Sequence, residues 1–268
     1  MYKLIAIDID DTLITDDKRV TTGTSEAIHK AVEQGVHVTL ATGRMYASAQ
    51  AIAKQLQLNV PLITYQGSLI KTALDERILY ERHVPTDIAE SLFAYCDVHN
   101  LHIQAYHNDQ LYAKKINQKL LDYCALSNVP YTIEPEIHKL AQLPQTKMII
   151  IDEPARLDLL KPQFEAMFGD RVHITKSKPN FLEFIHPEGT KGHALHVLAD
   201  LFDCPMDSVI AIGDSWNDVE MLQAAGLGVA MGNAVPALKD VADYVTRTND
   251  DEGVKHVFEK FVFKNDEL

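Results

Sequence analysis

Two hydrophobic periodicities alternate along the chain. Mostly aliphatic and β-branched runs at residues 4–7, 36–41 and 61–64 predict short buried strands. Between them, apolar residues at every third or fourth position predict helices at 24–34, which Gly35 is placed to end, and around 49–56. Strands that alternate with helices pair in parallel through crossover connections. We therefore expect parallel pairing up to about residue 83.

The pattern changes between residues 84 and 186. A helix followed by two strands is predicted twice there, and the second copy repeats the layout of the first but not its residues. The predicted elements are a helix at 86–100, strands at 101–106 and 110–113, a second helix at 154–168, and strands at 171–175 and 181–185. Two such units predict a small inserted α+β domain with an antiparallel-rich sheet.

The alternation of strands and helices resumes at Thr190, which can cap a helix that runs to about residue 201. A strand at 209–213, a helix at 219–225 and a strand at 227–231 follow. The predicted fold class is therefore α/β, with a parallel-sheet domain into which an α+β domain is inserted.

The first predicted strand ends in three acids, Asp8, Asp10 and Asp11. Ligands of open α/β sheets bind beyond the carboxyl ends of the strands, so a site is expected at this turn. Carboxylates this close repel one another unless a cation or a proton relieves the repulsion, and Mg²⁺ prefers such oxygen ligands. A polar turn that caps a helix would explain the same acids.

Two later strand ends carry complementary groups. Thr42, Gly43 and Arg44 lie between a strand and a helix start, where unpaired backbone N–H groups favour anions. A threonine at this place can also simply cap the helix. Asp214 and Asp218 follow the strand at 209–213.

Lys191 stands at the start of the helix before that strand and could add a fixed positive charge, although an exposed lysine beside a helix cap is the commoner case. If these strands are neighbours in one sheet, the acids, the hydroxyl of Thr42 and the helix starts converge on one crevice.

Composition narrows the classes of function. The 268 residues are 46% hydrophobic and 24% charged, as in ordinary globular proteins, and the formal net charge is -13. Nucleic-acid and anionic-membrane surfaces are basic, so this acidity argues against both, but not against a small phosphorylated ligand. The cysteines, which form no CxxC pair, are expected to be reduced and buried; they are Cys96, Cys124 and Cys204.

The sequence shows no signal-like segment and no apolar run of the ~20 residues that a membrane span needs. We therefore expect a cytoplasmic protein. The retention-like tail at 265–268 is expected to be coincidental, because such a tail is read only after translocation.

Four ordered motifs together resemble those of the haloacid dehalogenase superfamily of phosphatases. They are Asp8-Ile9-Asp10-Asp11-Thr12-Leu13, Ala41-Thr42-Gly43-Arg44, Lys191-Gly192 and Gly213-Asp214-Ser215-Trp216-Asn217-Asp218. The long insert, Met231-Gly232-Asn233-Ala234 and the segment 249–254 are similar to those of Cof-type, subfamily IIB members. This resemblance covers nearly the whole chain and implies a Rossmann-like core from residues 1–83 and 187–268, under an α+β cap from 84–186 that sets specificity.

The resemblance implies a phosphatase that hydrolyses small phosphorylated metabolites, sugar phosphates or cofactor phosphates, through an aspartyl-phosphate. Asp8 would be the nucleophile, and Asp10 the general acid and base. Mg²⁺ would be held by Asp8, the backbone carbonyl of Asp10, Asp214 and waters, with Asp218 bound directly or through water. The groups implied to contact the phosphoryl oxygens or the phosphate are Thr42 and Lys191, as catalytic groups, and Asp11, Gly43, Arg44 and Asn217.

Several positions depart from the family pattern or stay open. Asp11 stands where many members have glycine, and Gln66 stands where asparagine is common, which leaves the role of Gln66 open. Trp216, the only tryptophan, is expected to pack under its loop rather than to touch substrate. In the insert, the polar stretch at 175–180, with Lys176 and Lys178, is expected to line the substrate side.

Two other functions share these features. A phosphomutase or phosphotransferase would pass the phosphoryl group to a hydroxyl instead of water, and a receiver-like regulatory protein would keep it. The acid at Asp10 and the long insert favour turnover of a free small molecule. Neither the physiological substrate nor the oligomeric state follows from the sequence.

Overall fold

The computed structural model describes residues 2–57 and 59–263, so the tail at 265–268 lies outside the described residues. The strands are β1 (Leu4–Ile7), β2 (His37–Ala41), β3 (Pro61–Thr64), β4 (Leu69–Thr72), β5 (Ile78–Glu81), β6 (His102–His107), β7 (Gln110–Ala113), β8 (Thr132–Ile133), β9 (Lys147–Ile151), β10 (His173–Lys178), β11 (Phe181–Ile185), β12 (Val209–Gly213), β13 (Leu227–Ala230) and β14 (Tyr244–Val245). The α-helices are α1 (Thr22–Glu33), α2 (Tyr46–Gln55), α3 (Thr86–Val98), α4 (Gln118–Ser127), α5 (Pro154–Phe168), α6 (Lys191–Leu201), α7 (Val219–Ala224), α8 (Pro236–Lys239) and α9 (Gly253–Val257).

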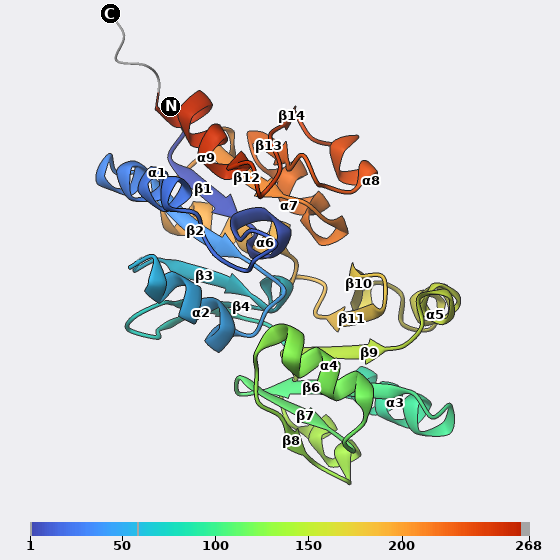
Figure 1. Cartoon of the computed structure of the whole chain (residues 1–268). Helices are drawn as coiled ribbons and strands as arrows, with labels where there is room; N and C mark the ends of the chain where they lie inside the picture. Colours follow the sequence, from blue (N-terminus) through green and yellow to red (C-terminus); the bar gives the residue numbers. More distant parts are fainter. Residues whose placement is uncertain (1, 58, 264–268) are drawn as a thin grey trace, which may run out of the picture.

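The strands form two sheets (Figure 1). The larger sheet has the order β14-β13-β12-β1-β2-β3-β4-β5, and the smaller has the order β10-β11-β9-β6-β7-β8. The first belongs to the core and the second to the cap, the name used here for the part of the chain that carries β6 to β11. The α/β fold class predicted from the sequence is confirmed.

The order in which the chain adds strands to the larger sheet reverses between β1 and β12. Both strands pair in parallel, yet the chain moves outward from β1 through β2 to β3 and outward from β12 through β13 to β14 on the opposite side. Right-handed crossovers then place α1 and α2 on one face and α7 on the other. Ligands bind at such switch points, beyond the carboxyl ends of the strands.

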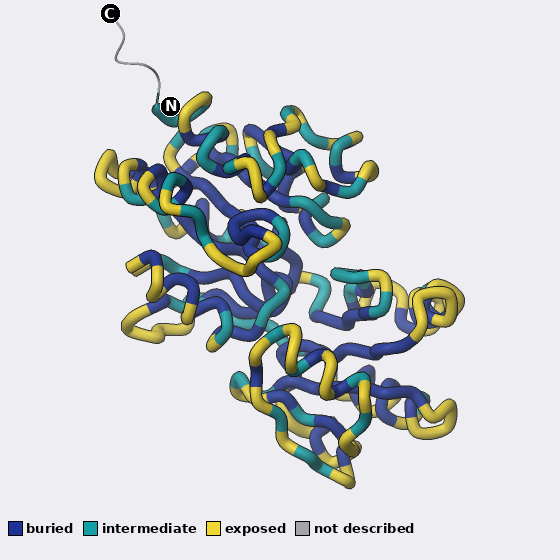
Figure 2. Tube along the Cα trace, viewed as in Figure 1, coloured by how far each residue is buried: buried dark blue, intermediate teal, exposed yellow. Residues whose placement is uncertain are grey.

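Helices cover both faces of the centre of this sheet, and the sequence of the central strands reflects it. Every residue of β1 and of β12 is buried; β1 reads Leu-Ile-Ala-Ile, and β12 reads Val-Ile-Ala-Ile-Gly. Figure 2 shows this buried centre in dark blue, with exposed positions along the outer sides of the helices. A continuous apolar run is what two covered faces require.

The expected parallel pairing up to residue 83 is wrong for its last part. β3 pairs antiparallel with β4, and β4 pairs antiparallel with β5. The segment 73–77 that joins β4 to β5 is a tight turn, too short for the crossover that parallel strands need. The sheet therefore ends in an antiparallel hairpin just before the chain enters the cap.

The cap contains the antiparallel-rich sheet that was expected, with one parallel pair between β7 and β8. Helices α3 and α5 bury Leu92 and Phe164 on one face of it, while Tyr106 and Tyr123 on the other side join the apolar cluster of the core. The strand expected at 171–175 lies at 173–178 instead, because Arg171 closes a short helical turn after α5.

No helix of the described part of the chain is long and apolar enough to cross a membrane. Cys96 and Cys204 are free and buried, as expected, whereas Cys124 is free but only half-buried.

Candidate active site

Asp8 follows directly on β1 at the switch point of the sheet. Its backbone N–H donates to the carbonyl of Ile212 at 3.0 Å, which continues the pairing of β1 with β12. Its side chain is buried, and Oδ1 accepts a hydrogen bond from Lys191 Nζ at 2.5 Å. The Asp8 carboxylate is therefore held in place by the ammonium group of Lys191.

Lys191 is the first residue of α6, whose N-cap is Thr190, a side chain that accepts from the backbone N–H of His193. The ammonium group is fully buried and also donates to Asp218 Oδ1 at 2.6 Å. Burial lowers the pKa of Lys191, but Asp218 and Asp8 outweigh it and raise the pKa above its usual value. The lysine is thus a permanent buried positive charge and not an exposed residue beside a cap.

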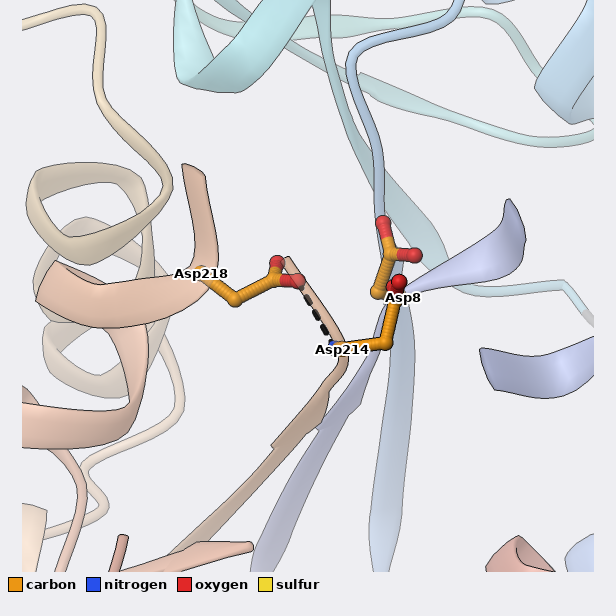
Figure 3. A group of neighbouring side chains, drawn as sticks. All are labelled: Asp8, Asp214 and Asp218. Atoms are coloured by element: carbon orange, nitrogen blue, oxygen red, sulfur yellow. Dashed lines mark hydrogen bonds between the residues drawn. The ribbon is translucent and has the colours of Figure 1, made fainter. Parts of the chain in front are cut away.

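Asp214 follows β12 and lies beside Asp8 (Figure 3). Its Oδ1 accepts a hydrogen bond from Thr12 at 3.2 Å. Asp218 approaches from the helical turn before α7 and accepts the backbone N–H groups of Asp214 and Ser215 on Oδ2, at 3.0 Å each. Both carboxylate oxygens of Asp218 therefore already have hydrogen-bond donors.

The three acids suit a hard divalent cation. One oxygen each from Asp8, Asp214 and Asp218 lie within 4.8 Å of one another. Burial raises the pKa of Asp8 well above its usual value, with Lys191 opposing the rise and the other acids adding to it. Burial and the charge of Asp218 raise the pKa of Asp214 to about 7. Buried carboxylates that repel one another in this way are relieved by a cation with a preference for oxygen ligands.

Asp10 lies apart from this group because Arg44 holds its side chain. Arg44 donates from Nε to Oδ2 at 2.8 Å and from Nη2 to Oδ1 at 2.7 Å, a two-pronged ion pair. Burial raises the pKa of Asp10, but the hydrogen bond and charge of Arg44 prevail, and the pKa is lowered. In this arrangement Asp10 is ionised, so it must leave Arg44 before it can carry a proton to a leaving group.

The loop after β2 differs in one respect from the expectation. Thr42 is buried and its Oγ1 accepts the backbone N–H of Arg44 at 3.1 Å. The first N–H groups of α2, at Tyr46 and Ala47, are not left for a ligand, because the carboxylate of Asp109 from the cap accepts both at 3.0 Å. The helix start is thus a contact between cap and core.

Asp11 adopts the left-handed conformation that its position requires, with φ at +57°. Aspartate tolerates this conformation better than most residues, which explains how it can replace glycine here. Its side chain is 40% exposed and lies 3.5 Å from Lys18, while its carbonyl accepts from Asn233 Nδ2 at 2.7 Å.

Gln66 joins the core to the cap. Its Oε1 accepts from Asn217 Nδ2 at 2.8 Å, and its Nε2 donates to Glu183 Oε2 at 2.8 Å. Glu183 pairs with the buried Lys147, 3.3 Å away, which donates to the carbonyl of Gly43 at 2.7 Å. Sequence reasoning missed Lys147 and Glu183. Their signal was a lysine that opens one apolar strand, Lys147-Met148-Ile149-Ile150-Ile151, and a glutamate in the middle of another, Phe181-Leu182-Glu183-Phe184-Ile185.

The expectation that Trp216 packs under its loop is wrong, because the residue is 45% exposed. Ser215 and Asp218 form a capping box that fixes the backbone of this turn without the indole ring. Trp216 instead borders two cavities between cap and core.

The smaller cavity, of about 250 Å³, brings together most of the residues singled out in the sequence. From the core it is lined by Asp8, Asp10, Asp11, Thr42, Gly43, Arg44, Asp214 and Asn217, and from the cap by Lys147, Lys178 and Glu183 among others. Asp218 does not line this cavity, and Lys191, which bonds both Asp8 and Asp218, lines the second cavity. Lys176 lines the second cavity instead and is paired with Asp158 at 2.6 Å.

Known proteins resemble this chain over almost its full length. The family model of the haloacid dehalogenase-like hydrolases matches residues 5–258. M6_Spy0533 of Streptococcus pyogenes serotype M6, whose name marks it provisionally as a phosphatase, is 37% identical over 267 residues, which are 97% of this chain and 98% of that protein. The Bacillus subtilis protein named 5-amino-6-(5-phospho-D-ribitylamino)uracil phosphatase YitU is 28% identical, over 96% of this chain and 97% of its own length.

The crystal structure of TM0651 from Thermotoga maritima has a TM-score of 0.84 at 33% identity and covers 97% of both chains. This similarity supports the fold, and the family match and the phosphatase-named relatives identify the enzyme class. The chain belongs to the haloacid dehalogenase-like hydrolases and is a phosphatase.

Proposed function

We propose that this phosphatase hydrolyses small phosphorylated metabolites in a Mg²⁺-dependent reaction that passes through an aspartyl-phosphate on Asp8. One observation carries the proposal: the buried carboxylate of Asp8 borders the smaller cavity, and the buried ammonium group of Lys191 holds it at 2.5 Å. A carboxylate held in this way is a nucleophile for phosphoryl transfer, which depends mainly on positioning and on stabilisation of charge.

The residues divide the reaction between them. Asp8 attacks phosphorus, the bond to the leaving oxygen breaks, and Asp10 gives that oxygen a proton. Asp10 then takes a proton from water, which attacks the aspartyl-phosphate and releases inorganic phosphate. Thr42 and Lys191 bind the phosphoryl oxygens, and the loop groups of Asp11, Gly43, Arg44 and Asn217 surround the phosphate.

Mg²⁺ would be held by Asp8, the backbone carbonyl of Asp10 and Asp214. Asp218 would reach it through water, because its two oxygens already accept from Lys191 and from two backbone N–H groups. When bound, the ion supplies positive charge to the transferring phosphoryl group.

Sugar phosphates and cofactor phosphates are the proposed substrates, and YitU, a relative by sequence, is named for a phosphorylated ribityl compound. The three free cysteines support a reducing compartment, the cytoplasm.

The test measures phosphate release from a panel of phosphomonoesters with Mg²⁺ or with chelator. We expect metal-dependent release that disappears in Asp8→Asn and persists in the control Asp17→Asn, which changes an exposed acid of the same segment. Release that survives in Asp8→Asn would contradict the mechanism. Transfer to an added sugar hydroxyl would show a phosphotransferase, and a phosphoryl group that stays on Asp8 for hours would show a regulatory protein.

A further inference from the structure

A second, larger cavity adjoins the catalytic one. Its volume is about 720 Å³, within the range of ligand sites, and it lies between β10 and α5 of the cap and the turn before α7. Trp216, Asn217 and Pro179 line both cavities, so the two meet at the indole ring.

We infer that Trp216 binds the leaving group of the substrate by stacking, and that this group is a planar nitrogen heterocycle. The inference rests on the proposed function, because it takes the phosphate of the substrate to lie beside Asp8. It selects, among small phosphate esters, those with a flat aromatic ring that can extend from the smaller cavity across Trp216 into the larger one.

The setting of Trp216 supports a role in binding. It is the only tryptophan of the chain, and nearly half of it is exposed at the junction of two cavities. A large apolar ring left open at a cavity marks a binding surface, and aromatic rings recognise flat partners through offset stacking. The loop that carries it is fixed on both sides, by the bonds of Asp218 to the N–H groups of Asp214 and Ser215.

The charges of the larger cavity argue against a second anion there. On its wall Lys176 pairs with Asp158 at 2.6 Å, and Lys161 pairs with Glu165 at 2.5 Å. His173 lies 3.8 Å from Glu220. These charged groups are thus already matched to one another.

Apolar side chains form a further part of the wall of the larger cavity, beside the polar Gln66, Thr175, Thr190 and Asn217 and the paired Lys191. Ile174 and Ile185 contribute from the cap, and Val219 contributes from the core. Such a surface favours a flat, weakly polar ring over a ring of hydroxyl groups, whose hydrogen bonds to water would be lost without replacement.

The single tryptophan permits a test that does not need turnover. Its fluorescence reports on Trp216 alone, so Asp8→Asn protein is titrated with pyridoxine 5′-phosphate and, in parallel, with glucose 6-phosphate. We expect saturable quenching by the pyridine ester and none by the sugar ester. No quenching by pyridoxine 5′-phosphate up to millimolar concentration would overturn the inference.

Kinetics give the second readout. In Trp216→Ala the ratio of kcat/KM for pyridoxine 5′-phosphate to that for glucose 6-phosphate should fall about five- to a hundredfold, the size of one stacking interaction, and Trp216→Phe should recover much of it. Leu201→Ala, which truncates another exposed apolar side chain, should leave both values unchanged. An unchanged ratio in Trp216→Ala would refute the stacking role. Natural protein that releases phosphate from no ester would refute the proposed function instead, while the fluorescence titration would still decide the inference.

Discussion

The amide of Gln66 donates a 2.8 Å hydrogen bond to Glu183, and this contact joins the turn after β3 to the cap. The same amide accepts from Asn217, while Glu183 is paired with Lys147, which reaches the carbonyl of Gly43. A continuous polar chain thus runs from the loop after β12 through the cap to the loop after β2. Through this chain the cap is bonded to two of the loops that surround the proposed phosphate site.

Gln66→Met should weaken this chain, because methionine keeps the length of the side chain but cannot donate to Glu183 or accept from Asn217. We expect kcat/KM to fall about tenfold for the best substrate, as for loss of a hydrogen bond to a charged group. Steady-state kinetics on the phosphate panel measure it. Gln66→Asn keeps an amide on a shorter side chain, so its kcat/KM should lie between those of the natural protein and of Gln66→Met.

Gln57→Met is the matched control. Gln57 also has a positive φ, +54° against +65° for Gln66, but its side chain is exposed at the end of α2. The same chemical change at a residue with a similarly positive φ should leave kcat/KM unaltered. Equal losses in both variants would show that backbone strain, and not the cap contact, causes the effect.

Lys147→Met should destabilise the protein by about 3–5 kcal/mol, because it leaves Glu183 buried without its cation. Both side chains are almost completely buried, at 1% and 2% exposure. Urea unfolding measures the loss, and the double variant with Glu183→Gln should recover a substantial part of it. Strict additivity of the two changes would mean that the pair is not coupled. Lys176→Met, whose partner Asp158 is 65% exposed, should cost about 1 kcal/mol or less.

Mg²⁺ should stabilise the protein more at pH 8 than at pH 6. Burial and Asp218 raise the pKa of Asp214 from its ordinary 3.8 to about 7. In metal-free protein this protonated acid favours folding at low pH, and that contribution is lost as pH rises through about 7. Binding of Mg²⁺ needs the carboxylate, so its affinity should fall up to about tenfold per pH unit below 7.

The measurement is Tm with Mg²⁺ and with chelator at pH 6, 7 and 8. The difference between the Tm with Mg²⁺ and the Tm with chelator should widen as pH rises, and it should be strongly reduced in Asp214→Asn. A gap of constant size would show that the metal does not displace a proton from this acid.

Arg44→Gln should reduce stability at neutral pH by about 1 kcal/mol, a value kept small because the Asp10 side chain is 36% exposed. Burial acts against the shift, but Arg44 lowers the pKa of Asp10 below its ordinary value. An acid whose pKa is lowered by folding stabilises the folded state at pH values above its ordinary pKa, and this contribution is lost as the pH falls. Unfolding at pH 7 and pH 3.5 should therefore show the difference between natural protein and variant narrowing at the lower pH. The exposed pair of Arg82 and Glu188 supplies a control, since Arg82→Gln should change stability less.

The sequence alone predicted the strand ends and the acids that they carry, because a buried parallel strand is a short continuous apolar run. Asp8, Thr42 and Asp214 follow such runs, and the sheet brings the three ends together. The hairpin of β4 and β5 was not predicted. Its residues are partly exposed and it needs no crossover helix, so neither periodicity marks it.

Contacts between cap and core could not be predicted in the same way. Asp109 looks like an ordinary turn residue, and only the folded chain shows its carboxylate at the start of α2. Trp216 was assigned to packing because large rings are usually covered, but the turn that carries it is held by its own acid and hydroxyl. Hydrogen bonds and ion pairs between residues far apart in the chain produce no periodic pattern in its sequence.

The place of β12 beside β1 has a consequence for synthesis on the ribosome. β1 is made first, yet the strand that covers one of its edges begins at Val209, after the whole cap has been translated. At ordinary elongation rates this leaves an apolar strand edge unpaired for roughly 10 to 40 s. The nascent chain should therefore depend on a holding chaperone during that interval, and catalytic competence should arise only when translation is nearly complete.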